Sequence, residues 1–110
     1  MTDSASHTAR PPLVLTVDIG STSIRARLFD ARARAIPDAG CELRRAASSD
    51  GLEDPAELAD ATERTIDTTL ASAGPMASEI ACVAMATFVG NVMGVDDAGD
   101  PVTPLYTYAH

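Results

Sequence analysis

The residues best suited to chemistry lie in one short stretch that begins at Asp18. Gly20 follows two positions later, and three consecutive hydroxyl residues come directly after it. A carboxylate can bind Mg²⁺, and a glycine lets the backbone turn tightly and a bulky anion approach. Successive hydroxyl and amide donors suit phosphate oxygens, and an arginine adds a fixed positive charge. The stretch therefore predicts a site for Mg²⁺, with Asp18 as the metal ligand, and for nucleotide phosphates, held by Asp18, Gly20, Ser21, Thr22, Ser23 and Arg25.

The same residues also suit a tight hairpin turn that binds no ligand. Asp-x-Gly-Ser turns are common, and Arg25 and Arg27 alternate with apolar residues as the outward side chains of a strand do. An apolar strand precedes the motif and an alternating strand follows it, and this context favours the phosphate site over the bare turn.

The charge balance excludes several classes of partner. Sixteen acidic residues against eight basic residues give a net charge of −8. Such a chain is unsuited to a nucleic-acid backbone or to an anionic membrane surface. All eight basic residues are arginines, so a Walker A loop and a Schiff-base lysine are both excluded.

Cysteine and histidine positions give no metal site. Cys41 and Cys82 are not part of a CxxC pair, and His7 and His110 lie at opposite ends of the chain. We expect reduced thiols in a cytoplasmic protein, because the sequence contains neither a secretory signal nor an apolar run of membrane-spanning length.

The elements expected to position the motif are a three-stranded meander, a helix and one further strand. The apolar run 13–18 predicts a buried strand, and the alternation over 24–30 predicts a second strand paired antiparallel with it. A turn at 35–40 leads to a third strand at 41–45, and 46–53 is expected to be a loop. Strand 79–87 follows the helix and should return parallel to the first strand.

The helix is predicted to span residues 55–73. Asp54 suits the N-cap, Pro55 the first helical position and Glu57 the third, which is a capping-box pattern. Gly74 and Pro75 should end it. The predicted core-facing stripe consists of Leu58, Ala61, Thr65, Ile66, Leu70 and Ala73. Beyond the last strand, 91–96 suggests another short strand turned by 97–101, and Tyr106 and Tyr108 are expected to pack on a core.

The run from Asp18 to Asp30 resembles the first phosphate motif of the actin, Hsp70 and sugar-kinase superfamily. It is most similar to that of FGGY carbohydrate kinases, where the pattern is Asp-x-Gly-(Ser/Thr)-(Thr/Ser)-Ser-x-(Arg/Lys) and ends in Phe-Asp. Residues 80–104 are similar to a second segment of that family, in which a strand leads to a substrate-contacting loop and then to Asp-x-x-Gly-x-Pro. The resemblance implies an α/β fold: a partial ribonuclease-H-like, actin-like ATPase domain. Residues 13–110 would be an incomplete N-terminal domain behind a disordered tail at 1–12.

The resemblance also implies an activity, the ATP- and Mg²⁺-dependent phosphorylation of a hydroxyl of a sugar, polyol or sugar acid. Substrate contacts would fall on Phe88, Val89, Gly90 and Asn91, although Gly90 stands where several family members carry histidine. Family members are several times longer, so the catalytic base is expected beyond His110, no catalytic residue is assigned here, and the isolated chain should be inactive.

Two other interpretations stay open. In the first, the chain is a non-catalytic fragment that binds nucleotide or interacts with another chain. In the second, it belongs to another branch of the actin-like ATPases. For the kinase interpretation the expected partner is a small-molecule sugar or polyol, with no nucleic acid and no membrane. The unpaired sheet edge suggests self-association or pairing with a missing C-terminal portion.

Overall fold

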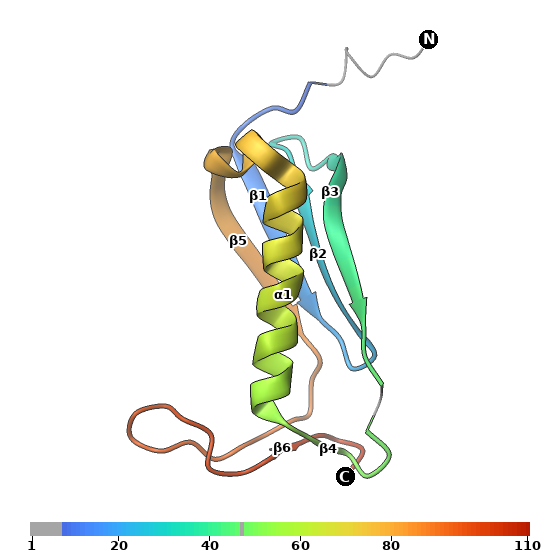
Figure 1. Cartoon of the computed structure of the whole chain (residues 1–110), viewed down its shortest axis with the longest axis vertical. Coiled ribbons are helices and arrows are strands. Elements are labelled where there is room, and N and C mark those ends of the chain that lie inside the picture. The colour runs from blue at the N-terminus through green and yellow to red at the C-terminus, as the bar shows by residue number, and fades with distance from the viewer. Residues whose placement is uncertain (1–7, 47) are drawn as a thin grey trace.

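A computed structural model describes residues 8–46 and 48–110 of the chain, and its main element is a four-stranded sheet (Figure 1). The strand order is β3-β2-β1-β5, with bounds β1 Leu13–Ile19, β2 Ser23–Phe29, β3 Ala35–Arg44 and β5 Ile80–Thr87. β2 pairs antiparallel with both β1 and β3, whereas β5 lies parallel to β1. The predicted α/β fold, a meander followed by a crossover helix and a parallel strand, is confirmed.

The crossover helix α1 spans Pro55–Ala73, as the sequence predicts. Asp54 caps it, because its side chain accepts a hydrogen bond from the Ala56 amide at 2.9 Å. Gly74 ends the helix with a φ of 59°, and the 3₁₀ helix η2, Gly74–Glu79, carries the chain on to β5.

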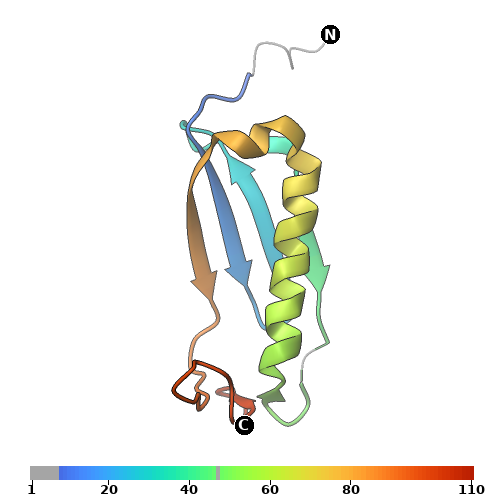
Figure 2. The same cartoon turned by 60° about the vertical axis from the view of Figure 1, so that its left-hand side comes forward.

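One face of the sheet and one side of α1 form the core. Helix α1 packs against β3 and β2, and in Figures 1 and 2 β5 lies to one side of it, outside its cover. The helix approaches the sheet along small side chains: its buried residues are Ala61, Thr65, Thr69 and Ala73. The larger members of the predicted stripe, Leu58, Ile66 and Leu70, are only partly buried beside this line. Small residues at the contact allow the helix axis to approach the sheet closely.

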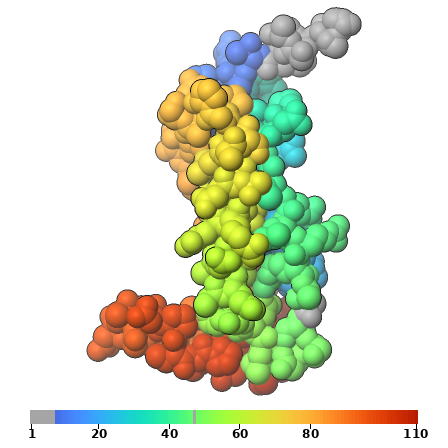
Figure 3. Space-filling view, in the orientation of Figure 1, coloured from blue at the N-terminus to red at the C-terminus, as the bar shows by residue number. Residues whose placement is uncertain are grey.

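Both faces of β5 are exposed along most of its length. Val83 and Met85 are 56% and 57% exposed, and the strand has β1 as its only neighbour in the described sheet. The segment that follows β5 projects sideways at one end of the molecule (Figure 3). It also carries exposed apolar side chains, among them Val92, Val95 and Val102.

Four sequence predictions need correction. Strand β3 begins at Ala35, so the predicted turn at 35–40 is wrong; those residues form a bulge in which Asp38 has a φ of 60°.

Residues 52–53, predicted as loop, form strand β4 (Leu52–Glu53), which pairs with β6 (Leu105–Tyr106). Among the described residues, 91–96 contributes only isolated bridges, although the turn at 97–101 is confirmed by the Gly99 amide, which donates to the Asp96 carbonyl at 2.9 Å. Tyr106 and Tyr108 are 36% and 76% exposed rather than packed on a core.

The predicted disordered tail, 1–12, includes residues 1–7, which lie outside the described residues. Within the remainder, the Arg10 amide donates to a carboxylate oxygen of Asp30 at 3.3 Å, and the Arg10 carbonyl accepts from the Ala31 amide at 2.8 Å. This part of the chain therefore lies against the turn between β2 and β3.

Candidate functional site

The β1–β2 hairpin places Asp18 directly opposite Arg25. Arg25 donates to one carboxylate oxygen of Asp18, Oδ2, from Nε at 3.1 Å and from Nη2 at 2.6 Å. The two neighbours of Asp18 in β1 are buried, and strand side chains alternate between faces, so Asp18 lies on the sheet face opposite α1. The side chains of Asp18 and Arg25 are 51% and 47% exposed. The strand is buried on either side of Asp18, as expected, but the side chain of Asp18 itself is half exposed.

Arg25 also fixes the start of β2. Its Nη1 donates to the hydroxyl of Ser23 at 2.6 Å, and Ser23 is buried. A methyl group on Gly20 would lie 2.8 Å from the Ser23 carbonyl oxygen and 3.1 Å from Arg25 Nη2. Glycine is therefore required at position 20 by the packing of the hairpin itself.

The tip of the hairpin presents hydrogen-bond donors to solvent. Ser21 and Thr22 are exposed. In the part of the chain that the structure describes, neither their amide N–H groups nor their hydroxyl groups donate to a protein acceptor. Two free amides and two hydroxyls beside a guanidinium group are a donor set that suits an anion.

The carbonyl groups of the same turn are all occupied. The Gly20 amide donates to the Ser23 carbonyl at 2.8 Å, and the Arg45 amide donates to the Thr22 carbonyl at 2.8 Å. Arg45 Nη1 donates to the carbonyl oxygens of Gly20 and Ser21 at 2.8 and 3.0 Å. The turn thus exposes its donors and covers its acceptors.

Arg45 and its partner Glu53 were not predicted as site residues. Nothing in their spacing marks them, because the contact depends on where β3 ends relative to the hairpin and on the short strand β4. Both side chains are largely buried and form an ion pair. Burial lowers the pKa of Arg45 from its ordinary value, but a guanidinium group starts so high that it stays charged at neutral pH.

The predicted substrate residues lie at the same end of the sheet as the hairpin tip. Phe88 extends the β1–β5 ladder, because its amide donates to the Ile19 carbonyl at 2.9 Å, one residue before Gly20. Phe88 and Asn91 line a cavity of about 430 Å³ together with the first turns of α1, and Asn91 Nδ2 donates to the Phe88 carbonyl at 2.6 Å. Val89 is 80% exposed, and Gly90 lies against Tyr108.

Asp30, the last residue of the motif, has a structural role. Its carboxylate accepts from the backbone amides of Arg10, Arg32 and Arg34 and from the Arg34 side chain, at 2.9 to 3.3 Å. Burial alone would raise the pKa of Asp30, but the hydrogen bonds from Arg34, Arg10 and Arg32 hold that pKa well below its usual range. A carboxylate so fully engaged orders the turn between β2 and β3 and is not available as a base.

The residues of the hairpin fit Mg²⁺ only as a partial site. Oδ1 of Asp18 accepts no hydrogen bond from the described residues and is open to a cation. Across residues 8–46 and 48–110, no group of three or more histidine, cysteine, aspartate or glutamate side chains could hold a metal ion. A single carboxylate such as Asp18 is enough for a partial site, because Mg²⁺ usually takes one or two protein carboxylates and completes its shell with phosphates and water.

Comparisons with known proteins identify the fold. No protein-family model and no curated protein matches the chain. Solved structures do match. A xylulose kinase from Rhodospirillum rubrum has a TM-score of 0.73 at 23% identity, and a gluconate kinase from Lactobacillus acidophilus has 0.67 at 20%. A Plasmodium falciparum glycerol kinase with ADP gives 0.70 at 13%.

Each of these alignments covers 88% of this chain and 20% of the kinase chain. The chain therefore spans about a fifth of the length of the structures that it matches, and it shares its fold with that part of them. The predicted similarity to the opening part of carbohydrate kinases is confirmed at the level of the fold. No helix among the described residues is long and apolar enough to cross a membrane.

Proposed function

We propose that this chain supplies the phosphate-binding side of the nucleotide site in an ATP-dependent carbohydrate kinase. Residues 13–110 would be the incomplete N-terminal domain of that enzyme. The observation that carries the proposal is the hairpin tip, where a half-exposed carboxylate, a guanidinium group and unpaired amides lie together. The fold shared with xylulose, gluconate and glycerol kinases supports it.

In this proposal each hairpin residue has a separate task. Asp18 would hold Mg²⁺ through its free oxygen, and the bound ion would neutralise charge on the phosphates. Arg25 keeps Asp18 in place and brings its positive charge toward the phosphate oxygens. The free amides and hydroxyls of Ser21 and Thr22 would bind those oxygens, while the small Gly20 keeps the tip compact.

The acceptor would be a hydroxyl of a sugar, polyol or sugar acid. Its place would be beside Phe88 and Asn91, which line a cavity at the same end of the sheet as the hairpin tip but on its α1 side. Two described carboxylates, Asp30 and Asp96, do not suit the role of general base because both are engaged in turns. Asp30 is engaged by the turn that it orders, and Asp96 Oδ1 accepts from the Ala98 and Asp100 amides at 2.9 Å.

The proposal predicts weak binding without turnover for the chain alone. Phosphoryl transfer gains most of its rate from charge stabilisation and positioning around the transferring group. One carboxylate, one cation and a few donors supply only part of that, so we expect a Kd for Mg-ATP on the order of millimolar. One rival interpretation, an interaction fragment without a nucleotide site, predicts no nucleotide binding.

Calorimetric titration with Mg-ATP, beside a coupled assay of ADP release over a panel of sugars and polyols, distinguishes these cases. Saturable weak binding without sugar-dependent ADP release agrees with the proposal. Absence of binding at millimolar nucleotide would support the rival interpretation. Micromolar affinity with sugar-dependent turnover would mean that the chain holds a complete active site.

A further inference from the structure

We infer that Arg45 is a positioning residue for the phosphate turn, with Glu53 as its anchor. The inference deepens the proposed function and rests on it for the identity of the ligand. The arrangement itself is independent of any ligand, because it concerns which groups of the turn are occupied and which are left free.

Arg45 accounts for most of the acceptors of the turn. Four carbonyl groups belong to residues 20–23, and Arg45 binds three of them, two through Nη1 and one through its own amide. The fourth accepts from the Gly20 amide within the turn. Without the guanidinium group, the Gly20 and Ser21 carbonyls would lose their donor, and the peptide planes would be free to rotate toward water.

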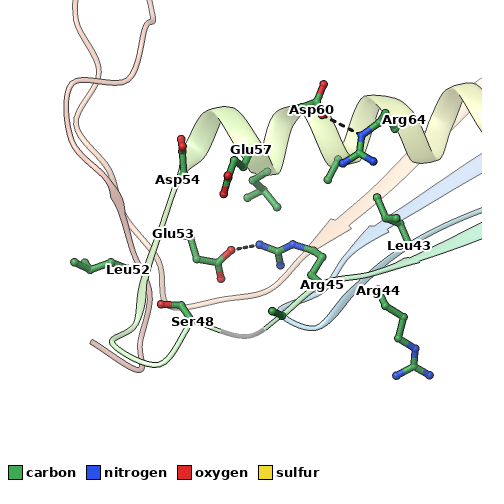
Figure 4. Close-up of a pocket in the computed structure, with 13 residues that line it drawn as sticks. Leu43, Arg44, Arg45, Ser48, Leu52, Glu53, Asp54, Glu57, Asp60 and Arg64 are labelled. Carbon is green, nitrogen blue, oxygen red and sulfur yellow. Dashed lines mark hydrogen bonds and ion pairs between the residues drawn. The ribbon is translucent and has the colours of Figure 1, made fainter.

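Glu53 holds Arg45 in the position that this requires. The Arg45 and Glu53 side chains are 13% and 10% exposed, and they point toward each other across the gap between the end of β3 and β4 (Figure 4). Glu53 directly precedes the helix cap Asp54. The ion pair therefore connects the hairpin tip to the start of α1, the most regular element of the chain.

The chemistry favours arginine at this position over lysine. The guanidinium group is planar and has separate N–H donors, so it binds two carbonyls through Nη1 and a carboxylate through Nη2 at the same time. A lysine keeps the charge but presents one ammonium group on a flexible stem. Hydrogen bonds from a cation to the carbonyls also polarise the peptide groups and strengthen the free amides as donors.

The first test needs no nucleotide. In wild type, backbone ¹⁵N relaxation should give rigid order parameters of about 0.85 for Ser21 and Thr22, and Arg45→Lys should lower them toward about 0.6. The amides of β1 should not change. The matched control is Arg64→Lys, because Arg64 also pairs with a carboxylate, that of Asp60 at 3.0 Å (Figure 4), but these two side chains are 62% and 68% exposed. A turn that stays rigid in Arg45→Lys would overturn the inference.

The second test measures affinity for Mg-ADP. Arg45→Lys should weaken binding by about tenfold, the equivalent of one charged hydrogen bond, and Arg64→Lys should not change it. Glu53→Gln keeps the arginine and loses the charged anchor, so it should give a smaller change in the same direction and serves if Arg45→Lys does not fold. Equal affinity in the wild type and a folded Arg45 variant would contradict the inference.

The two tests separate the inference from the proposed function. If wild type binds no Mg-ADP but the turn loses order in Arg45→Lys, the proposed function fails and the positioning role stands. If wild type binds Mg-ADP and Arg45→Lys changes neither order nor affinity, the positioning role fails and the proposed function stands.

Discussion

Replacing Asp18 by asparagine separates a ligand-binding role from a structural one. In the ligand-free chain the change removes the ion pair with Arg25, whose two side chains are 47% and 51% exposed. Ion pairs with this exposure contribute about 0–1 kcal/mol, because water and salt screen them. Asparagine keeps an oxygen acceptor for Arg25, and Arg25 keeps its bond to Ser23. We therefore expect the free energy of unfolding to fall by less than about 1 kcal/mol.

Nucleotide binding should respond differently, because the carboxylate is the only charged oxygen that the hairpin offers to Mg²⁺. We expect Asp18→Asn to weaken Mg-ATP binding by at least about tenfold, which corresponds to about 1.4 kcal/mol. Urea unfolding and titration of the same samples measure both quantities. Asp60→Asn is a matched control, since Asp60 is also exposed and paired with an arginine. A loss of several kcal/mol in stability with unchanged affinity would show that Asp18 serves the fold and would refute the assignment.

Three further predictions concern the scaffold. Leu28→Ala should lower the free energy of unfolding by about 2–5 kcal/mol, because Leu28 is fully buried. Leu70→Ala should lower it by about 1–2 kcal/mol, because Leu70 is only partly buried. Equal losses in urea unfolding would contradict the described packing. The pKa of Asp30 is lowered in the folded chain from its ordinary value of 3.8. The ionised carboxylate should therefore stabilise the fold fully above pH 3.8, and this contribution to the free energy of unfolding should be lost as the pH falls below that value. Asp30→Asn should flatten the acid side of the stability profile, and a profile that stays unchanged would contradict this role of Asp30. Met85→Lys should reduce self-association in sedimentation experiments, because β5 is an uncharged edge strand; association that is unaffected would place the contact elsewhere.

The parts of the fold that follow from the sequence are those with a local cause. Helix α1 has its predicted bounds because a capping aspartate, a proline and a terminal glycine mark them within the sequence. The pairing of β1 with β2 follows from a link too short for any other connection. The juxtaposition of Asp18 and Arg25 follows in turn from that hairpin register.

The parts that the sequence did not predict depend on contacts between distant segments. Pro37 and Asp38 suggest a turn, yet the strand continues through them as a bulge because β2 supplies a partner on both sides of it. Strand β4 is two residues long and exists only because β6 pairs with it. Arg45 reaches the hairpin tip from the position directly after β3, and no residue spacing in the sequence indicates that contact.

Site-resolved NMR titration of the 110-residue chain with Mg-ADP measures whether the tip of the β1–β2 hairpin binds nucleotide phosphate. We expect saturable shifts of the Ser21 and Thr22 amides that depend on Mg²⁺ and are lost in Asp18→Asn. Shifts spread over α1, or none at the hairpin tip at millimolar Mg-ADP, would contradict this expectation.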